Sequence, residues 1–308
     1  MRNKIRIATR KSLLALWQAE YVAGRLRAQY PGMDVELLPV STRGDEILDK
    51  PLTEIGGKGL FIKELEYMML EGKADLAVHS LKDVPAELPA GFAIAAVTAR
   101  EDPRDAFVSS AYDSVDALPP HARVGTSSLR RKSQLLHRRG DLQISSLRGN
   151  VQTRLRKLDE GQYDAVILAA AGLKRLGLGG RIRSYLETEE SIPAAGQGVM
   201  AVEIRESDGA LRALLSFLHD EAIAAAVCGE RAFLGCVGGD CKVPAGAHAV
   251  PDGKGSLYMD AFISSEDGTR FFRRQASGAV SEAKRLGTSL AEALLEDGGR
   301  DVLEEIGK

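Results

Sequence analysis

Along the first third of the chain, apolar and polar positions alternate in a way that predicts strands separated by helices. The expected strands are residues 4–8, 35–40 and 74–79. The expected helices are residues 12–29 and 63–70. Ser12 is a suitable N-cap for the first helix, and Gly72 closes the second. This alternation favours a mostly parallel sheet covered by helices.

The middle of the chain repeats the same scheme. The expected strands are residues 123–125, 143–146 and 163–169. Helices are expected from residue 128 onward and over 151–158. The sequence Glu-Gly-x-x-Asp occurs at 71–75 and again at 160–164, each time between a helix end and an apolar strand. The echo is short, but it fits two α/β domains of similar build with a cleft between them, where ligands usually bind.

From His219 onward the pattern changes. A helix is expected over 224–234, then short strands with turns at 251–253 and 266–268, then a long helix over 280–295. This predicts a small α+β third domain. The turn-rich segment 192–198 is expected to cross back to the first domain, which would make that domain discontinuous.

Length and composition limit the class of protein. A chain of 308 residues usually forms two or three domains, and a net charge of −2 gives no overall attraction to nucleic acid or membrane. Its longest apolar stretch, 166–173, is far shorter than the roughly 18 residues of a membrane helix. The apolar run 13–17 is too short for the core of a secretory signal. Three cysteines are no disulfide framework, so we expect a cytoplasmic protein.

Positive charge is concentrated in one segment. Residues 123–157 contain ten Lys or Arg and a single acid, Asp141. The arginines expected near strand-to-helix junctions are Arg130, Arg131, Arg148, Arg154 and Arg175. Helix N-termini and arginine forks both bind anions. We assign Arg138, Arg139, Arg156 and Lys157 to an ordinary solvated helix face.

Nucleic acid is the competing ligand for this segment. Single-strand binding normally needs aromatic side chains for base stacking, and 123–157 contains no Phe, Tyr or Trp. Phosphate or carboxylate ligands therefore fit better than bases.

Asp83 follows the expected strand 74–79, at the edge where sites of open α/β sheets lie. A carboxylate there can donate a proton to a leaving amine and then stabilise a cation. Spacing alone favours a simpler interpretation, in which Lys82 and Asp83 form a solvated turn before Pro85.

The glycine-rich segment 56–61 suggests a loop that brings Lys58 over a bound anion. It lacks the spacing of a P-loop, and no Ser or Thr follows the lysine, so the signal is weak.

Three cysteines and one histidine lie close together in the sequence, at Cys228, Cys236, Cys241 and His248. A zinc site must be considered, but only the Cys236-to-Cys241 spacing comes near the usual pattern. Cys228, next to an apolar run, is expected to be a buried helical cysteine. Cys241 lies among glycines beside Lys242 and is the thiol we expect to be reactive. A Cys-His hydrolase ranks low, because the histidines show no partner motif.

Nine further motifs accompany these features. They are ATRKS at 8–12 with LWQA at 16–19, TRGD at 42–45, GKGLF at 57–61, HSLKDVP at 79–85, GTSSLRR at 125–131, LRGNVQTR at 147–154, GLKRL at 172–176, PAAGQG at 193–198 and the loop around Cys241. In this order the motifs closely resemble the porphobilinogen deaminase family, along the whole chain and most densely before residue 245.

The resemblance implies a three-domain fold whose first two domains are similar to periplasmic-binding-protein lobes. It implies a dipyrromethane cofactor, attached through a thioether to Cys241 and made from the enzyme's own substrate. Four porphobilinogen molecules would be joined head to tail, each losing ammonia, and water would release linear hydroxymethylbilane for tetrapyrrole (heme-type) biosynthesis.

Carried over by motif, Asp83 would be the catalytic carboxylate. The residues that would bind the cofactor and the growing chain are Arg10, Ser12, Lys58, Ser80, Lys82, Thr126, Ser128, Arg130, Arg131, Arg148, Arg154, Arg175 and Gln197. No metal is expected. One departure is Asp240, which stands where family members often have glycine and could raise the pKa of the neighbouring thiol.

We expect an α/β first domain formed by 1–98 and 199–217, an α/β second domain at 99–198, and an α+β third domain at 218–308. The expected partner is porphobilinogen, with no nucleic acid or membrane, and the family implies a monomer. Two other classes stay open: a non-catalytic solute-binding protein, which the missing signal disfavours, and a zinc-stabilised anion-binding regulator.

Overall fold

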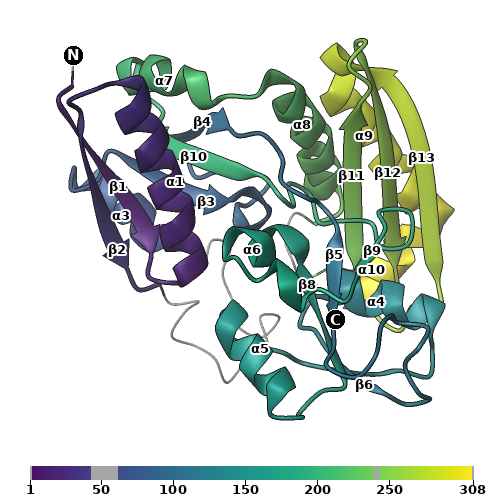
Figure 1. Cartoon of the computed structure of the whole chain (residues 1–308). Coiled ribbons are helices and arrows are strands. Elements are labelled where there is room, and N and C mark those ends of the chain that lie inside the picture. Colours follow the sequence, from purple (N-terminus) through teal and green to yellow (C-terminus); the bar gives the residue numbers. More distant parts are fainter. Residues whose placement is uncertain (1, 43–61, 239–242, 307–308) are drawn as a thin grey trace.

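A computed structural model describes residues 2–42, 62–238 and 243–306 (Figure 1). The first of its three sheets has the order β2-β1-β3-β10-β4. Its strands are β2 (Asp34–Val40), β1 (Lys4–Arg10), β3 (Leu76–Ser80), β10 (Met200–Arg205) and β4 (Phe92–Val97). β1 runs parallel to β2 and β3, and β10 runs antiparallel to β3 and β4. Its helices are α1 (Leu13–Gln29), α3 (Lys63–Leu70) and α7 (Gly209–Leu215).

The second sheet repeats this arrangement, with the order β7-β6-β8-β5-β9. Its strands are β7 (Gln143–Ser145), β6 (Arg123–Gly125), β8 (Ala165–Ala169), β5 (Asp105–Val108) and β9 (Ser184–Leu186). Three parallel strands are again followed by an antiparallel one, here β5. The helices of this domain are α4 (Leu129–Arg138), α5 (Val151–Asp159) and α6 (Ala170–Arg175).

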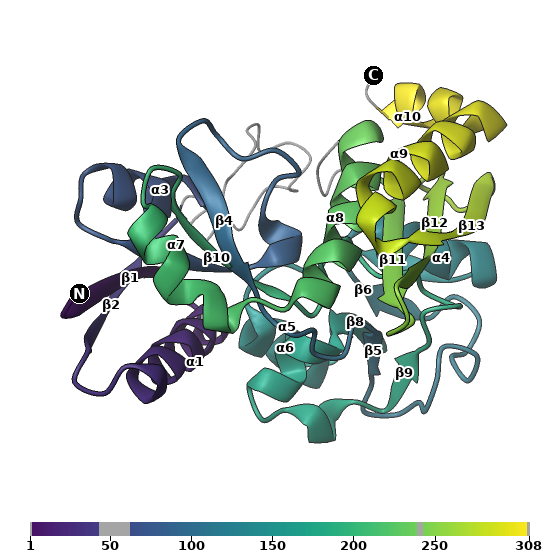
Figure 2. The ribbon, with the colours of Figure 1, turned by 90° about the horizontal axis from the view of Figure 1, so that it is seen from above.

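The third domain is a three-stranded antiparallel sheet of β11 (Ala245–Pro251), β12 (Ser256–Ser264) and β13 (Phe271–Ala279). Helices α8 (Glu221–Cys236) and α9 (Ala283–Leu294) pack against one face and against each other (Figure 2). The opposite face contacts α4 of the second domain, where His137 stacks on Phe271 with ring centroids 4.2 Å apart. These three domains confirm the expected fold class.

One expected helix differs. Instead of a single helix over 280–295, the chain forms a short 3-10 turn (Val280–Glu282), α9, a π turn (Leu295–Gly299) and α10 (Arg300–Ile306). The break falls at Gly298, whose positive φ of 121° no helix contains.

The repeated Glu-Gly-x-x-Asp sequence occupies equivalent places in the two α/β domains. Asp75 accepts a hydrogen bond from the backbone N–H of Arg6 at 2.8 Å, and Asp164 accepts one from that of Arg123 at 2.7 Å. Both carboxylates also accept bonds from the side chain of the same arginine. Each acid thereby fastens the start of its strand to a neighbouring parallel strand. This equivalence supports two domains of one build.

The chain crosses between these two domains twice. After β4 it enters the second sheet at β5, and after β9 it returns to the first sheet at β10. The predicted return through 192–198 is therefore confirmed. The domain limits expected near 98, 198 and 217 stay a prediction.

A buried carboxylate on α8 joins the third domain to both crossings. Glu230, with no exposed surface, accepts from the Arg100 guanidinium at 2.7 Å, from the Gly196 N–H at 2.7 Å and from the Ala249 N–H at 2.8 Å. Burial alone would raise the pKa of this carboxyl, but the charge of Arg100 lowers it. A single ionised acid thus connects α8 and β11 to the first and the second crossing.

Gly198 in the second crossing offers a test of how closely the two crossings pack. Its φ is +87°, and a Cβ there would lie 2.2 Å from the Glu101 carbonyl oxygen in the first crossing. Gly253 has a similar φ of +72° but nothing within 4 Å. We expect Gly253→Ala to cost about 1–2 kcal/mol of unfolding free energy through backbone strain. Gly198→Ala should cost about 1–3 kcal/mol more, because the added methyl group would also displace the backbone at Glu101. Urea unfolding of both variants measures this, and equal losses would contradict it.

Candidate active site

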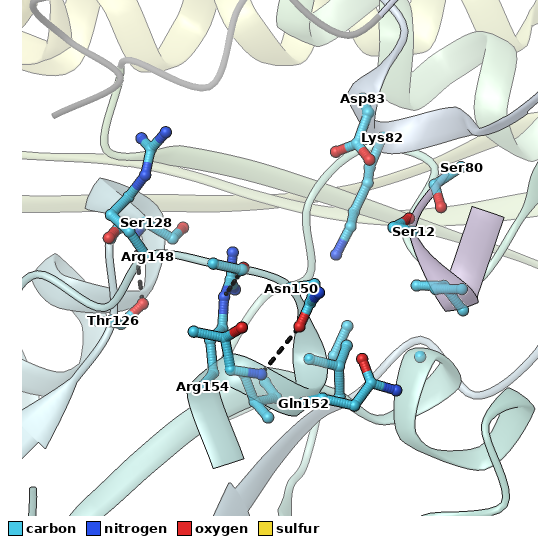
Figure 3. A pocket seen from close by; sticks show the side chains of 18 of the residues that line it. Ser12, Ser80, Lys82, Asp83, Thr126, Ser128, Arg148, Asn150, Gln152 and Arg154 are labelled. Atoms are coloured by element: carbon cyan, nitrogen blue, oxygen red, sulfur yellow. Dashed lines mark hydrogen bonds between the residues drawn. The ribbon is translucent and has the colours of Figure 1, made fainter. Parts of the chain in front are cut away.

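A pocket of about 530 Å³ lies between the two α/β domains and is lined from both sides (Figure 3). The first domain contributes Arg10, Lys11, Ser12, Leu14, Ser41, Ser80, Lys82 and Asp83. The second contributes segments 126–128 and 148–154, with Arg130, Arg131, Leu168, Ala169 and Gly172. Ala194 and Gln197 come from the return crossing.

The sheet topology brings these segments together. Arg10 ends β1, Ser80 ends β3, Ala169 ends β8 and Thr126 directly follows β6. All four strands belong to the parallel parts of the two sheets, and their carboxyl ends face one cleft, as in other open α/β sheets.

Two helices of the second domain begin at the pocket. Ser128 caps α4 by accepting from the Arg131 N–H, and Asn150 caps α5 by accepting from the Thr153 N–H at 2.9 Å (Figure 3). Helix N-termini attract anions through their N–H groups and the helix dipole. The caps therefore place two favourable electrostatic ends beside the basic side chains.

The pocket is strongly positive. Of the described residues that line it, seven are basic, and Asp83 is the single acid. Burial, reinforced by the charge of Arg131, lowers the pKa of Lys82 to about 8. Burial likewise lowers the pKa of Arg154 to about 10, with Arg131 and Arg148 adding to the effect. Both shifts mean that burial and neighbouring cations destabilise the protonated forms of these side chains, and a bound anion would stabilise those forms again.

Asp83 sits on a short 3-10 turn, η1 (Leu81–Asp83), immediately after β3. The turn is fixed from several sides. The Leu81 N–H donates to the Val199 carbonyl at 2.9 Å, and a Cβ on Gly196 would approach Leu81 to 2.8 Å. Gln18 of α1 donates to the Ser80 hydroxyl at 2.8 Å. The acid faces the pocket from the first domain, while Arg148 and Arg154 come from the second (Figure 3).

Arg130 and Arg131 are largely committed to a structural acid. Arg131 donates to Asp105 Oδ1 through Nε at 2.9 Å and Nη2 at 2.7 Å, and Arg130 donates to Oδ2 at 2.8 Å. Gln197 donates to Oδ1 at 3.0 Å. Burial alone would raise the pKa of Asp105, but the two guanidinium charges lower it. The carboxylate thus stays ionised inside the protein.

Most of the predicted binding residues meet in this pocket. They are Arg10, Ser12, Ser80, Lys82, Thr126, Ser128, Arg130, Arg131, Arg148, Arg154 and Gln197, together with the predicted acid Asp83. Lys58, Cys241 and Asp240 lie outside the described residues.

Arg175 is not among the lining residues. It donates to the Gly198 carbonyl at 2.6 Å, and its guanidinium lies 5.8 Å from the centre of the Trp17 ring. It therefore contacts the return crossing and helix α1 rather than the cavity.

Sequence reasoning missed several residues of the site. The polar ones are Lys11, Ser41, Ser127, Asn150, Gln152, Thr153 and the buried Asp105. Five of them lie inside motifs, which gave the available signal: Lys11 in 8–12, Ser127 in 125–131, and Asn150, Gln152 and Thr153 in 147–154. Asp105 gave a weaker one, an acid that directly precedes the apolar residues Ala-Phe-Val.

The expectation for Cys228 is wrong. Its side chain is exposed, because α8 turns Ala226, Val227, Glu230 and Phe233 inward and leaves position 228 outside. Cys236 is also exposed. Within the described ranges, no group of three His, Cys, Asp or Glu side chains is arranged to hold a metal ion.

The solvated-face assignment needs refinement for two arginines. Arg138 pairs with Asp116 and Glu190, and Arg139 pairs with Asp141 at 2.7 Å while donating to the Val115 and Leu118 carbonyls. Both fasten loops of the second domain. Arg156 fits the assignment, because its side chain is exposed and pairs with the exposed Glu160.

None of the helices in the described parts of the chain is both long and apolar enough to span a bilayer.

Fold and site together define a two-lobed α/β protein with a strongly basic pocket between the lobes. A family model described as porphobilinogen deaminase, dipyromethane cofactor binding domain, matches residues 5–213, and the porphobilinogen deaminase C-terminal domain matches 224–296. The chain belongs to the porphobilinogen deaminase family. It is accordingly a transferase with hydroxymethylbilane synthase activity and a dipyrromethane cofactor, as the motifs implied.

Several solved structures are similar at low identity. The methionine-binding protein MetQ is 14% identical over 70% of this chain and 89% of its own, with a TM-score of 0.45. A periplasmic substrate-binding protein from Coxiella burnetii is 16% identical over 72% and 94%, with a TM-score of 0.45. A putative methionine-binding lipoprotein from Bacillus subtilis is 12% identical over 70% and 90%, with a TM-score of 0.43. Likenesses of this size say nothing about what this chain binds.

The lowered pKa of Lys82 predicts a pH-dependent affinity for anions. Above pH 8 the folded protein loses this proton and with it one attractive charge, and a bound dianion raises the pKa again. We expect the affinity for succinate to fall about tenfold between pH 7 and pH 9, with proton uptake on binding. Lys82→Met should remove this slope. Calorimetric titration in buffers of different ionisation enthalpy measures both, and an equal slope in the variant would contradict the assignment.

Proposed function

We propose that the pocket between the first two domains is the place where porphobilinogen molecules are joined head to tail. Each addition releases ammonia, and water finally releases linear hydroxymethylbilane. Cys241 is proposed to carry the dipyrromethane primer through a thioether bond. The observation that carries this proposal is seven basic side chains gathered around one acid in a single pocket.

The charges of the pocket match those of the ligands. Each pyrrole unit bears an acetate and a propionate, so a two-ring primer brings four carboxylates and every addition brings two more. The seven basic side chains and the N-termini of α4 and α5 offset these charges. Charge-assisted hydrogen bonds of this kind contribute roughly 1.5–3 kcal/mol each. The residues present therefore fit the cofactor, which when bound supplies the pyrrole carbon that accepts the first substrate.

Asp83 is assigned to the reacting amine because the other ionisable side chains on the described wall of the pocket would repel that amine. The aminomethyl group of the substrate is cationic, and every other ionisable side chain on the described wall of the pocket is basic. The ammonium is attracted to the one carboxylate and repelled elsewhere. There the ionised Asp83 can hold the ammonium group until it leaves as ammonia, stabilise the positive charge left on the substrate, and then accept the proton that the acceptor pyrrole loses.

The arginines divide into two roles. Arg148, in the loop before α5, and Arg154, on α5, are proposed to bind the carboxylates directly. The residues around them are Arg10, Lys82, Ser12, Ser80, Thr126 and Ser128. Arg130 and Arg131 are held by Asp105, so they present an oriented positive charge rather than mobile side chains. Gln197 links this group to the first domain, since its Oε1 lies 3.4 Å from Lys82 Nζ.

Pocket size restricts how the product grows. Cavities of roughly 300–1,000 Å³ hold one drug-sized ligand, and this one measures about 530 Å³. Four added units exceed that space, so the growing chain is proposed to move past a fixed Asp83. Relative movement of the two lobes is the expected accommodation.

The remaining expectations complete the proposal. No Phe, Tyr or Trp stands among the described lining residues, which supports a carboxylate ligand over nucleic acid. We propose a cytoplasmic monomer with the three domains divided near residues 98, 198 and 217.

Asp83→Asn tests the acid. The amide keeps the size of the side chain but neither carries negative charge nor accepts a proton, so turnover should fall about 10²–10⁴-fold with little change in melting temperature. Asp113→Asn, an exposed acid paired with Arg183, serves as the control and should keep full activity. Rates from the release of ammonia decide the matter, and full turnover in Asp83→Asn would refute the assignment.

Cys241→Ala tests the attachment site. The denatured wild-type protein should carry extra mass equal to two porphobilinogen units less two ammonias, and the variant should carry none. Cys236→Ala, the nearest other cysteine, should retain the extra mass. Intact-protein mass spectrometry makes the comparison; an adduct lost in Cys236→Ala and kept in Cys241→Ala would move the attachment to Cys236.

A further inference from the structure

Arg231 on α8 donates hydrogen bonds to three consecutive carbonyls of the first domain. Its Nη1 lies 3.2 Å from the Val84 oxygen, and its Nη2 lies 2.7 Å from that of Pro85 and 2.9 Å from that of Ala86. A planar guanidinium with five donors can serve three carbonyls at once, whereas a lysine ammonium is a compact point charge. These bonds join the third domain to the segment that directly follows Asp83.

This segment has little regular structure to hold it. After the turn Leu81–Asp83, the chain runs through Pro85 toward β4 without a helix or strand. The turn is closed by the bond from the Val84 N–H to the Leu81 carbonyl at 3.0 Å. Beyond that point the Arg231 guanidinium supplies the polar contacts of the Val84, Pro85 and Ala86 carbonyls.

Apolar packing acts in the same direction. Leu81 and Val84 are buried in one cluster with Val227, one turn before Arg231 on α8. A Cβ on Gly235 would lie 3.8 Å from that of Ala86, so the last turn of the helix also passes close to the segment. Helix and segment therefore pack together on both sides of the arginine.

The Arg231 guanidinium is mostly removed from water and donates to these three carbonyls. Burial lowers its pKa, which shows that the guanidinium has given up water. Within the described residues its hydrogen bonds go to backbone carbonyl oxygens, whose dipoles compensate the charge.

We propose that Arg231 is a positioning residue for Asp83, which fixes the carboxylate against helix α8. The inference rests on the proposed role of Asp83 as the acid. Helix α8 is also the element from which the chain leads on to Cys241. The same arginine would thus keep the acid in register with the domain that carries the primer.

Arg231→Met and Arg231→Lys test this inference. We expect Arg231→Met to lower kcat about 10- to 100-fold with KM within about twofold, because a small displacement of a reacting group costs that much. Arg231→Lys should recover part of the loss. Rates are divided by the fraction of cofactor-loaded protein, obtained by intact mass. A loss that disappears on this correction overturns the proposal.

Arg205→Met is the matched control. Arg205 of β10 also donates to two backbone carbonyls, of Met69 at 2.5 Å and Ala74 at 2.9 Å, away from the pocket. It should lower the melting temperature as Arg231→Met does and leave kcat unchanged. Equal losses of kcat in the two variants would mean a general structural effect and overturn the proposal.

A double variant separates this inference from the role of Asp83. If Arg231 acts through the acid, adding Arg231→Met to Asp83→Asn should lower single-turnover rates by less than about twofold. Multiplying losses would overturn the positioning role. Full turnover in Asp83→Asn alone would instead refute the proposed role of Asp83, whatever the effect of Arg231→Met.

Amide hydrogen exchange gives a readout that is independent of activity. The segment 84–88 should lose protection from exchange in Arg231→Met and not in Arg205→Met. Unchanged protection in Arg231→Met would count against the proposal.

Discussion

Seven cationic side chains in one pocket repel each other, and the carboxylate of Asp105, which pairs with Arg130 and Arg131 from behind, offsets part of this positive charge. This carboxylate is fully buried and accepts from Arg130, Arg131, Ser191 and Gln197. It begins β5, directly after the first crossing, while Gln197 belongs to the second. The charge balance of the pocket and the junction of the lobes therefore depend on the same acid.

Glu230 does for the third domain what Asp105 does for the second. Each is a buried acid that satisfies an arginine and groups from the crossing segments. Removing one partner from such a buried pair commonly costs about 3–5 kcal/mol, because the other charge stays behind in the interior. The lobes thus have a polar, geometrically specific junction, and a purely apolar contact would leave their orientation less defined.

Local elements were predictable because their signals are local. Ser12 does cap its helix, accepting from the Ala15 N–H at 3.3 Å, and both glycine stops precede the expected strands. The basic residues of the motifs 125–131 and 147–154 do converge on one pocket. Family motifs, rather than periodicity, identified the activity, since spacing alone favoured a solvated turn at Asp83.

Long-range pairings were not predictable from one sequence. Nothing near Glu230 indicates Arg100, which lies 130 residues earlier, and nothing near Arg231 indicates the carbonyls of 84–86. Cys228 was misplaced because the run before it is apolar on every side of the helix, so periodicity could not tell the inner face from the outer. Arg175 belongs to a family motif, but its guanidinium contacts Gly198 and Trp17 and does not line the pocket. Only the three-dimensional packing shows which arginines of the motifs face the pocket.

One strand of the first sheet, β10, follows the whole second sheet in the sequence, and this order has a consequence for synthesis on the ribosome. When residue 199 has been made, all five strands of the second sheet exist, from β5 to β9. The first sheet still lacks β10, which separates β3 from β4 in the described order. Its edge strand β4 therefore has no neighbour in that sheet until residues 200–205 emerge. The lobe that is translated first is the lobe that is completed last.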